Sequence, residues 1–237
     1  MPSVLQAFRR PFAALLELLY PKLCLACEAT PPAPDSSLCW RCQYQLTPTE
    51  YHTETPNPVL ERFWGRVELE HASTSLAFNK GGLLQHLIHQ LKYNHQPQVG
   101  VELGRLYGQL LQGVTPYDTL EAIVPVPLHP DKRQVRGYNQ AAQFAQGIAE
   151  VLQLPFSEEW LIRTQHTESQ TKKSRLERFA NVEHAFEVAQ PSAICGKHLL
   201  LVDDVITTGA TLEACAKQLL QVEGVRVSVG AIALASR

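Results

Sequence analysis

Apolar residues along the chain form short continuous runs in some segments and recur at helical spacing in others. The short runs are typical of β-strands and lie at 66–78, 121–127, 198–205 and 225–235. The run at 198–205 is unbroken, as expected when both faces of a strand are covered. Helical spacing is found at 82–93, 99–113, 138–154 and 211–224, the last helix ending at Gly224. This alternation predicts an α/β fold, a mostly parallel sheet with flanking helices.

The N-terminal region differs in pattern from the rest. Residues 4–20 are not expected to be a signal peptide, because their apolar run is short and lacks a cleavage pattern. We expect them to form an amphipathic helix instead. Residues 21–58 hold four of the six cysteines and a proline-rich stretch. We therefore expect an N-terminal helix and small module over 1–58, and an α/β domain over 59–237. Since no stretch is long enough to span a bilayer, a cytoplasmic location is expected.

Four cysteines form two CxxC pairs, Cys24 with Cys27 and Cys39 with Cys42. Two such pairs can supply the four thiolates of a tetrahedral zinc site, and a closed four-sulfur shell makes that metal structural rather than catalytic. Two disulfides are the alternative, which fits poorly with a cytosolic chain. A redox role would need a thioredoxin-like surrounding. Trp40 is expected to pack around this module.

The segment LLLVDDVITTGAT, residues 199–211, joins a buried strand to a helix through acidic, hydroxyl and glycine residues. Loops at the carboxyl end of a parallel strand face the crevice in which α/β proteins bind ligands. The N–H groups and hydroxyls of this turn can bind a phosphate, and Gly209 lets the backbone approach it. Asp203 and Asp204 repel a phosphate, so they suit sugar hydroxyls or Mg²⁺. A ribose 5-phosphate fits both halves, and an ordinary strand end with a threonine N-cap is the alternative.

This segment resembles the phosphoribosyl diphosphate (PRPP) binding motif of type I phosphoribosyltransferases. Further motifs narrow the resemblance to the ComF family of competence-associated proteins. They are CLAC and CWRC, LKY at 91–93, PVPL at 125–128, RGYNQA from Arg136, and the stretch 163–186. The resemblance covers nearly the whole chain from about residue 15. It implies a type I phosphoribosyltransferase-like fold with an N-terminal zinc ribbon.

The resemblance also implies roles for residues of the strand and turn. Asp203 and Asp204 would be the catalytic pair that contacts the ribose hydroxyls. Both can reach one sugar only if the strand has ended near Asp203, because neighbouring strand residues point to opposite faces. The 5-phosphate would be held by the turn residues Thr207, Thr208, Gly209, Ala210 and Thr211. The implied ions are structural Zn²⁺ and, together with PRPP, Mg²⁺.

The diphosphate is expected at the loop that follows the strand 121–127. This loop carries Lys132, Arg133 and Arg136 directly before a helix, and guanidinium groups pair bidentately with phosphate oxygens. A solvated charged loop is the alternative. The polar stretch 163–181 resembles the mobile hood of phosphoribosyltransferases and would add Arg178 to the diphosphate contacts, whereas an exposed helix would show the same pattern.

Two functions are compatible with these residues. The first is an enzyme that transfers the pentosyl group of PRPP, with Mg²⁺, to an unidentified nitrogenous acceptor. Because ComF relatives are associated with DNA uptake and natural transformation, the second is a non-catalytic protein that binds single-stranded DNA or senses PRPP or nucleotides, with DNA-uptake proteins as partners. The formal net charge of −2 gives no global sign of a polyanion partner, so DNA would need a local basic patch.

Overall fold

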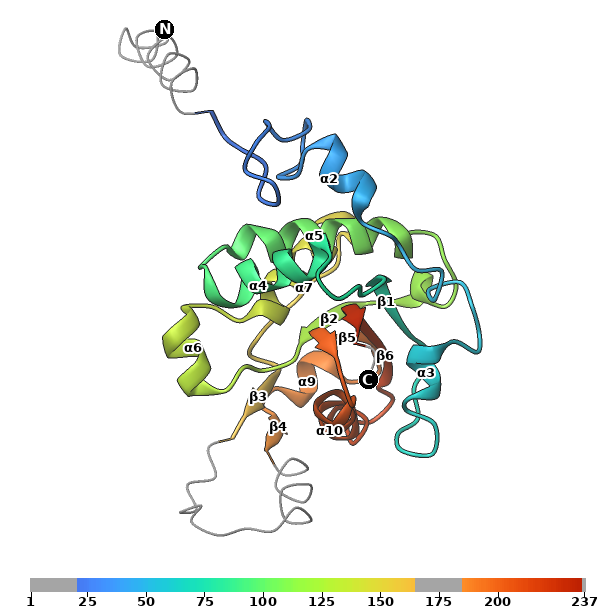
Figure 1. Ribbon diagram of the computed structural model, residues 1–237. Helices are drawn as coiled ribbons and strands as arrows, with labels where there is room; N and C mark the ends of the chain where they lie inside the picture. Colours follow the sequence, from blue (N-terminus) through green and yellow to red (C-terminus); the bar gives the residue numbers. More distant parts are fainter. Residues whose placement is uncertain (1–20, 165–184, 236–237) are drawn as a thin grey trace, which may run out of the picture. The chain divides into compact units, whose positions relative to one another are not determined.

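The computed structural model describes residues 21–164 and 185–235 and is shown in Figure 1. The chain divides into two compact units, Met1–Leu46 and Thr47–Arg237. In the first unit, the described residues form loops and one short helix, α2 (Trp40–Gln45). The helix expected over 4–20 lies outside the described residues.

The second unit is an α/β structure, in which helices and parallel strands alternate. Its elements are α3 (Pro58–Glu61), β1 (Ala72–Leu76), α4 (Leu83–Tyr93), α5 (Pro97–Leu111), the 3-10 helix η1 (Tyr117–Thr119), β2 (Ala122–Pro125), α6 (Pro130–Arg136), α7 (Gln140–Leu152), β3 (Leu161–Arg163), β4 (Phe186–Val188), α9 (Pro191–Ile194), β5 (His198–Ile206), α10 (Ala210–Leu219) and β6 (Arg226–Leu234). This order confirms the α/β class that the sequence predicts.

The central sheet is parallel, with strand order β1-β6-β5-β2. Strand β5 lies in its interior and pairs with β6 from His198 to Ile206, so that Asp203 stands opposite Ala231. Helices cover both faces (Figure 1): α4, α5 and α7 lie on one side of the sheet, and α9 and α10 on the other. This double cover explains the unbroken apolar run of β5, because neither face of the strand meets solvent. A separate hairpin pairs β3 with β4.

Helices α5 and α7 touch through their backbones. A Cβ atom added to Gly104 would lie 2.2 Å from the carbonyl oxygen of Phe144, and one added to Gly147 would lie 2.0 Å from that of Val101. Only glycine permits this approach. This explains why α5 and α7 contain glycines, although glycine lowers the intrinsic stability of a helix.

Both edges of the sheet are bordered by an irregular segment of the same chain. Next to β1, the N–H of Thr49 donates to the carbonyl of Ser75, and Pro48 forms an isolated antiparallel bridge with Leu76. Next to β2, the N–H of Ile123 donates to the carbonyl of Pro155. The segment beside β1 also explains why the second unit begins at Thr47, whereas the sequence pattern suggested a division after residue 58.

The elements differ from expectation in three places. The segment 130–136, interpreted as a loop, forms α6, which buries no residue and therefore has no apolar stripe to predict it. Helix α10 ends at Leu219, and Gly224 instead adopts a positive φ of 69° in the turn before β6. Strand β1 is shorter than the run at 66–78, and its residues ASTSL are all buried.

Candidate functional site

The turn between β5 and α10 forms the centre of the candidate site. Strand β5 ends at Ile206, and α10 begins at Ala210, with Gly209 as its N-cap residue. Gly209 has a φ of 78°, a left-handed conformation that favours glycine, and Thr207 and Thr208 are exposed. Because the first N–H groups of a helix have no acceptor within it, this turn presents backbone donors and hydroxyls together.

Asp203 and Asp204 are still part of the strand. Strand β5 continues to Ile206, so the condition that it ends near Asp203 is not met, and neighbouring side chains point to opposite faces. Asp204 pairs with Lys92 of α4. Burial and, after it, the charge of Asp203 raise the pKa of Cys215 in α10, although Lys92 also acts on the pKa of Asp203.

The carboxyl of Asp203 has a raised pKa. Burial, reinforced by the negative charge of Asp204, raises the pKa of Asp203 to about 7. Lys92 and Lys132 oppose this rise, but only in part. Because this value is close to neutral pH, the carboxyl of Asp203 can donate as well as accept a hydrogen bond there.

Lys92 was not identified from the sequence, although the LKY motif contains it. Its Nζ lies 2.9 Å from Oδ2 of Asp204. The end of α4 that carries Lys92 is held in place by the loop after α6: Tyr138 donates its hydroxyl to the carbonyl of Leu91 at 2.5 Å, and the guanidinium of Arg136 lies 5.5 Å from the ring centroid of Tyr93.

The cations expected at the diphosphate have different surroundings. Lys132 is exposed and acts on the pKa of Asp203. Arg133 Nη1 lies 3.3 Å from Oε2 of Glu158, and Arg136 Nη1 donates to Oε1 of Gln140 at 2.7 Å. Of these three cations, Lys132 is thus the one whose charge acts on the pKa of Asp203. Arg178 and residues 165–181 of the expected hood lie outside the described residues.

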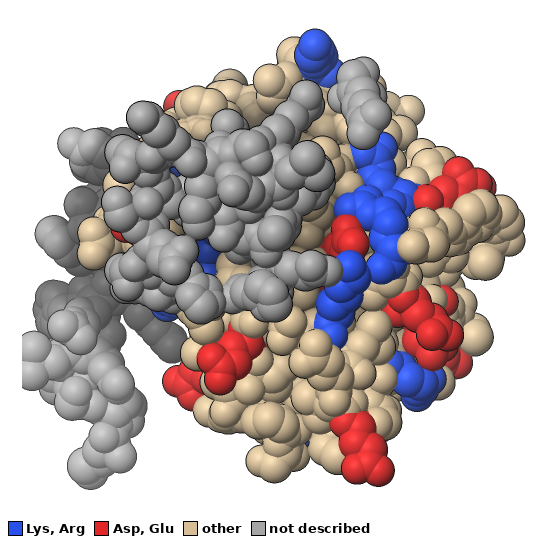
Figure 2. Space-filling model, turned by 90° about the horizontal axis from the view of Figure 1, so that it is seen from below, with Lys and Arg blue, Asp and Glu red and all other residues tan. Residues whose placement is uncertain are grey.

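The charged side chains of the molecule are unevenly distributed. Figure 2 shows Lys and Arg side chains gathered in a band on one face, with acidic side chains adjoining the band. A ligand that carries both phosphate groups and hydroxyls would find partners of both kinds on such a face.

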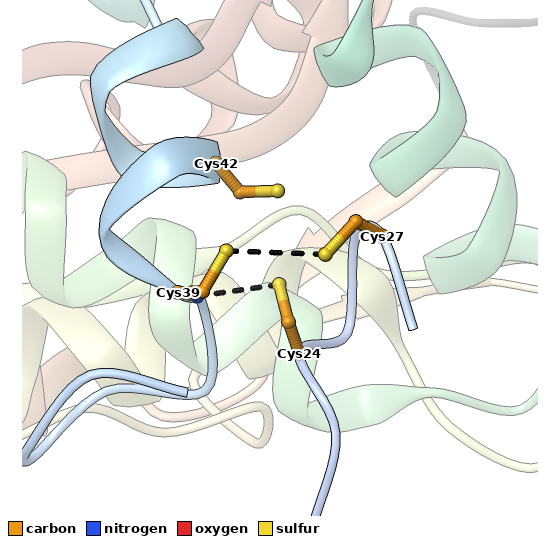
Figure 3. Close-up of side chains that lie close together, drawn as sticks. All are labelled: Cys24, Cys27, Cys39 and Cys42. Atoms are coloured by element: carbon orange, nitrogen blue, oxygen red, sulfur yellow. Dashed lines mark hydrogen bonds between the residues drawn. The ribbon is translucent and has the colours of Figure 1, made fainter. Parts of the chain in front are cut away.

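The four cysteines of the first unit converge on one point (Figure 3). The Sγ atoms of Cys24, Cys27, Cys39 and Cys42 all lie within 4.8 Å of one another. Sulfurs at the corners of a tetrahedron with Zn–S bonds of about 2.3 Å are about 3.8 Å apart, so the cluster fits a zinc ion. The N–H of Cys39 donates to Sγ of Cys24 at 3.2 Å, and the N–H of Ala26 donates to the same sulfur at 3.4 Å.

The pKa values of two of these thiols are also lowered. A hydrogen bond from the backbone of Ala29, followed by one from the side chain of Thr30, lowers the pKa of Cys27 to about 6. The side chain of Thr30 likewise lowers the pKa of Cys39. Burial raises the pKa of Cys42 above its usual value.

One expectation about a single residue proves wrong. Trp40 does not pack as a buried residue, because 70% of its surface is exposed. Of the two cysteines outside the cluster, Cys195 is exposed and Cys215 is buried.

Comparison with known proteins places these features in context. A family model of the phosphoribosyl transferase domain matches residues 139–237. DNA utilization protein YhgH of Escherichia coli K12 is 34% identical over 143 residues, which cover 58% of this chain and 61% of the relative. The chain thus spans about three fifths of that relative's length.

Two competence proteins are also similar. Competence protein F of Haemophilus influenzae is 29% identical over 215 residues, covering 86% of this chain and 94% of the relative. Competence protein ComFC of Bacillus subtilis is 39% identical over 112 residues, covering 47% of this chain and 43% of the relative.

Two solved structures have a limited likeness to this chain. A glutamine PRPP amidotransferase from B. subtilis has a TM-score of 0.40 at 19% identity, covering 60% of this chain and 30% of that chain. An adenine phosphoribosyltransferase has a TM-score of 0.41 at 15% identity, covering 60% of this chain and 74% of that chain. Within the described parts of the chain, no helix combines the length and apolar character needed to cross a membrane.

Proposed function

The chain is a ComF-family protein with a phosphoribosyltransferase-like domain, and on this premise we propose that its α/β unit binds PRPP at the turn between β5 and α10. One observation carries the proposal. Within a single stretch, two carboxylates on β5 are followed by an exposed hydroxyl turn at the N-terminus of α10. Carboxylates accept hydrogen bonds from a sugar diol, and helix N–H groups donate to its phosphate.

The 5-phosphate is assigned to the turn. Its ligands would be the N–H groups at the start of α10 and the hydroxyls of Thr207, Thr208 and Thr211. The backbone N of Ala210 lies 3.4 Å from Oγ1 of Thr208, a long contact that a phosphate oxygen can replace. The aligned peptide dipoles of α10 add favourable charge.

The ribose hydroxyls are assigned first to Asp204. Its carboxylate already accepts from a donor, Lys92, and a pair of hydroxyls would take over that role. Asp203 lies on the opposite face of the strand. When it is ionised, its negative charge would still attract a cationic sugar that forms beside Asp204. The two aspartates therefore support the reaction in different ways.

The diphosphate is assigned to the cations around this edge. Lys132 is free to turn toward it, and Lys92 would be released from Asp204 when the sugar binds. Arg133 and Arg136 would have to leave Glu158 and Gln140 to take part. Arg178 remains a further candidate.

The reaction proposed is pentosyl transfer. A nitrogen lone pair of the acceptor attacks C1 of the ribose, the bond between C1 and the diphosphate oxygen breaks, and the diphosphate leaves with the electron pair. The acceptor nitrogen then loses its proton to solvent. Lysine and arginine cations stabilise the leaving diphosphate, while the carboxylates stabilise the cationic sugar. Mg²⁺ bound with PRPP would neutralise charge on the diphosphate.

In the first unit we assign a structural zinc ion to Cys24, Cys27, Cys39 and Cys42. Four sulfurs close the coordination shell and leave no position for water, so this ion would stabilise the fold of the unit and take no part in the transfer.

Calorimetry with PRPP in the presence of Mg²⁺ tests the proposal directly. Asp204→Ala should abolish binding, whereas Asp118→Ala, which removes a carboxylate of η1, should leave binding unchanged. Unchanged PRPP affinity in the Asp204 variant would exclude the sugar assignment. A diphosphate-release assay against free bases then distinguishes an enzyme from a protein that only binds PRPP.

A second candidate function is binding of single-stranded DNA by the first unit. On α2, Trp40 and Tyr44 are one helical turn apart and are 70% and 93% exposed, with Arg41 beside them. Aromatic side chains stack on bases, and arginine pairs with the backbone phosphates. Such binding should weaken steeply as salt rises, and Trp40→Ala should weaken it further, whereas PRPP binding should respond to Mg²⁺ instead.

A further inference from the structure

Two arginines that follow α3 contact the turn between β5 and α10. Nη1 of Arg62 donates a hydrogen bond to the carbonyl oxygen of Thr207, and Nη1 of Arg66 donates to the carbonyl oxygen of Thr208 at 3.0 Å. Neither arginine belongs to a motif that the sequence singles out.

These contacts determine where the N–H groups of the turn point. In a planar trans peptide, the C=O of one residue and the N–H of the next point in opposite directions. Because the carbonyls of Thr207 and Thr208 face the arginines, the N–H groups of Thr208 and Gly209 face the other way. Both arginines therefore act on the two donors that a bound phosphate would use.

Arg66 is itself held by several acceptors. Its Nε donates to Oε2 of Glu213 at 2.9 Å, and its Nη1 also donates to the carbonyl of Arg62 at 2.9 Å. Glu213 stands in the first turn of α10, so one guanidinium connects the segment after α3, the turn and the helix. Burial alone would raise the pKa of Glu213, but hydrogen bonds from Lys217 and Arg66 lower it below its usual value.

Arg62 differs from Arg66 in its charge balance. Among the residues that the structure describes, no carboxylate forms an ion pair with Arg62, whereas Arg66 is paired with Glu213. Arg62 therefore adds net positive charge beside the turn, and this charge favours a dianionic group there.

Phe63 completes the contact between these two segments. A Cβ atom added to Gly209 would lie 3.0 Å from Cε1 of Phe63, whose side chain is fully buried. The turn thus rests against a buried ring, with an arginine contact to each of the two carbonyls that precede Gly209.

We propose that Arg62 and Arg66 are positioning residues for a sugar 5-phosphate: they hold two carbonyls of the 207–209 turn outward so that the N–H groups of Thr208 and Gly209 face the phosphate. The inference rests on the proposed function, because it concerns the same turn. It predicts that ligands with a 5-phosphate depend on both arginines, and that ligands without one do not.

Three probes test it by calorimetry: Mg²⁺–PRPP, ribose 5-phosphate, and Mg²⁺–diphosphate, which lacks the 5-phosphate. We expect Arg66→Ala to weaken the binding of Mg²⁺–PRPP and of ribose 5-phosphate by about tenfold or more, because charge-assisted hydrogen bonds set the geometry of the N–H donors. The binding of Mg²⁺–diphosphate should be unchanged. Arg66→Lys should behave like Arg66→Ala, since an ammonium cannot reproduce a planar fork that serves three acceptors. Arg62→Lys should keep part of the affinity that Arg62→Ala loses, because it retains the charge.

Arg105→Ala serves as the matched control, since Arg105 pairs with Glu150 on α5 and α7, away from the turn. Equal losses for all three probes in Arg66→Ala would mean a general structural role and would overturn the proposal, as would unchanged ribose 5-phosphate affinity. If the natural chain binds none of the probes, the proposed function fails. Ligand-free crystal structures of the natural chain and of Arg66→Ala then decide the positioning role: an unchanged direction of the Thr208 carbonyl would exclude it.

Discussion

Lys92 and Asp204 form an ion pair between α4 and the central strand β5, with Nζ and Oδ2 2.9 Å apart. The side chains are 22% and 14% exposed, so solvent screens the pair only in part. Val205 and Ile206 separate Asp204 from the turn to which we assign the phosphate. In the proposed complex, a sugar diol would take the place of Lys92 on Asp204.

The first prediction concerns the strength of this pair. Lys92→Met and Asp204→Asn should each lower the free energy of unfolding by about 1–2 kcal/mol, because each leaves a partly buried charge without its partner. The double variant should lose less than the sum of the two, with a coupling energy on the order of 1 kcal/mol. Urea unfolding of all four proteins measures this coupling, and strictly additive losses would contradict a direct pair.

The second prediction concerns the neighbouring carboxyl. The pKa of Asp203 is raised from 3.8 to about 7, by burial first and then by the charge of Asp204. The folded chain therefore keeps a proton that the unfolded chain has lost, and the free energy of unfolding should fall as the pH rises from about 4 to about 7.

Asp203→Asn removes this loss. At a pH near 8 it should be more stable than the natural chain, on the order of 2 kcal/mol, and the difference should shrink toward pH 4. Asp204→Asn is the matched variant and should have the opposite sign near pH 8, since it breaks the pair with Lys92. Thermal unfolding at both pH values tests the pair of predictions; a destabilised Asp203→Asn at pH 8 would refute the raised pKa.

The third prediction separates backbone strain from crowding in the turn. Gly209→Ala should destabilise the chain by about 2–4 kcal/mol, because alanine is strained at a φ of 78° and its Cβ would press on Phe63. Gly113→Ala is the control: its φ of 73° is nearly the same, but nothing lies within 4 Å of the added atom. It should cost only about 1–2 kcal/mol. Equal costs in chemical denaturation would mean that Phe63 does not constrain the turn.

The fourth prediction concerns the cysteine cluster. The purified chain should contain one zinc ion per molecule by elemental analysis, and Cys39→Ser should lower this content and destabilise the first unit. Chelation should have the same effect while leaving PRPP binding by the second unit intact. Cys195→Ser serves as the control and should retain the zinc. A zinc content that does not respond to Cys39→Ser would disprove the assignment.

The strand, turn and helix at the centre of the site could be predicted from the sequence because they are contiguous. The apolar run of β5 and the Thr–Gly turn are local signals, and each element begins close to where expected, although α10 ends earlier than expected. The same holds for the cysteines, whose CxxC spacing suffices to bring four sulfurs together. The similarity to ComF competence proteins and the α/β fold, which these motifs indicate, are confirmed.

The rest of the site depends on contacts between distant segments. Arg66 reaches the carbonyl of Thr208 across 142 positions of the chain, and no periodicity announces such a contact. Lys92 lies at the end of an amphipathic helix, where a solvent-exposed lysine is ordinary. Helix α6 has no buried face, so its charged residues had the pattern of a loop. The pattern of apolar residues reflects which positions are buried. It does not reveal polar contacts between distant segments, and the roles of these residues depend on such contacts.

The irregular segments beside β1 and β2 have a consequence for self-association. Open strand edges invite another chain to extend the sheet, and proline cannot donate the hydrogen bond that such an extension requires. Here Pro48 and Pro155 stand where a fifth strand would dock on either side. Extension of the central sheet by a strand of a second copy is therefore disfavoured at both of its edges.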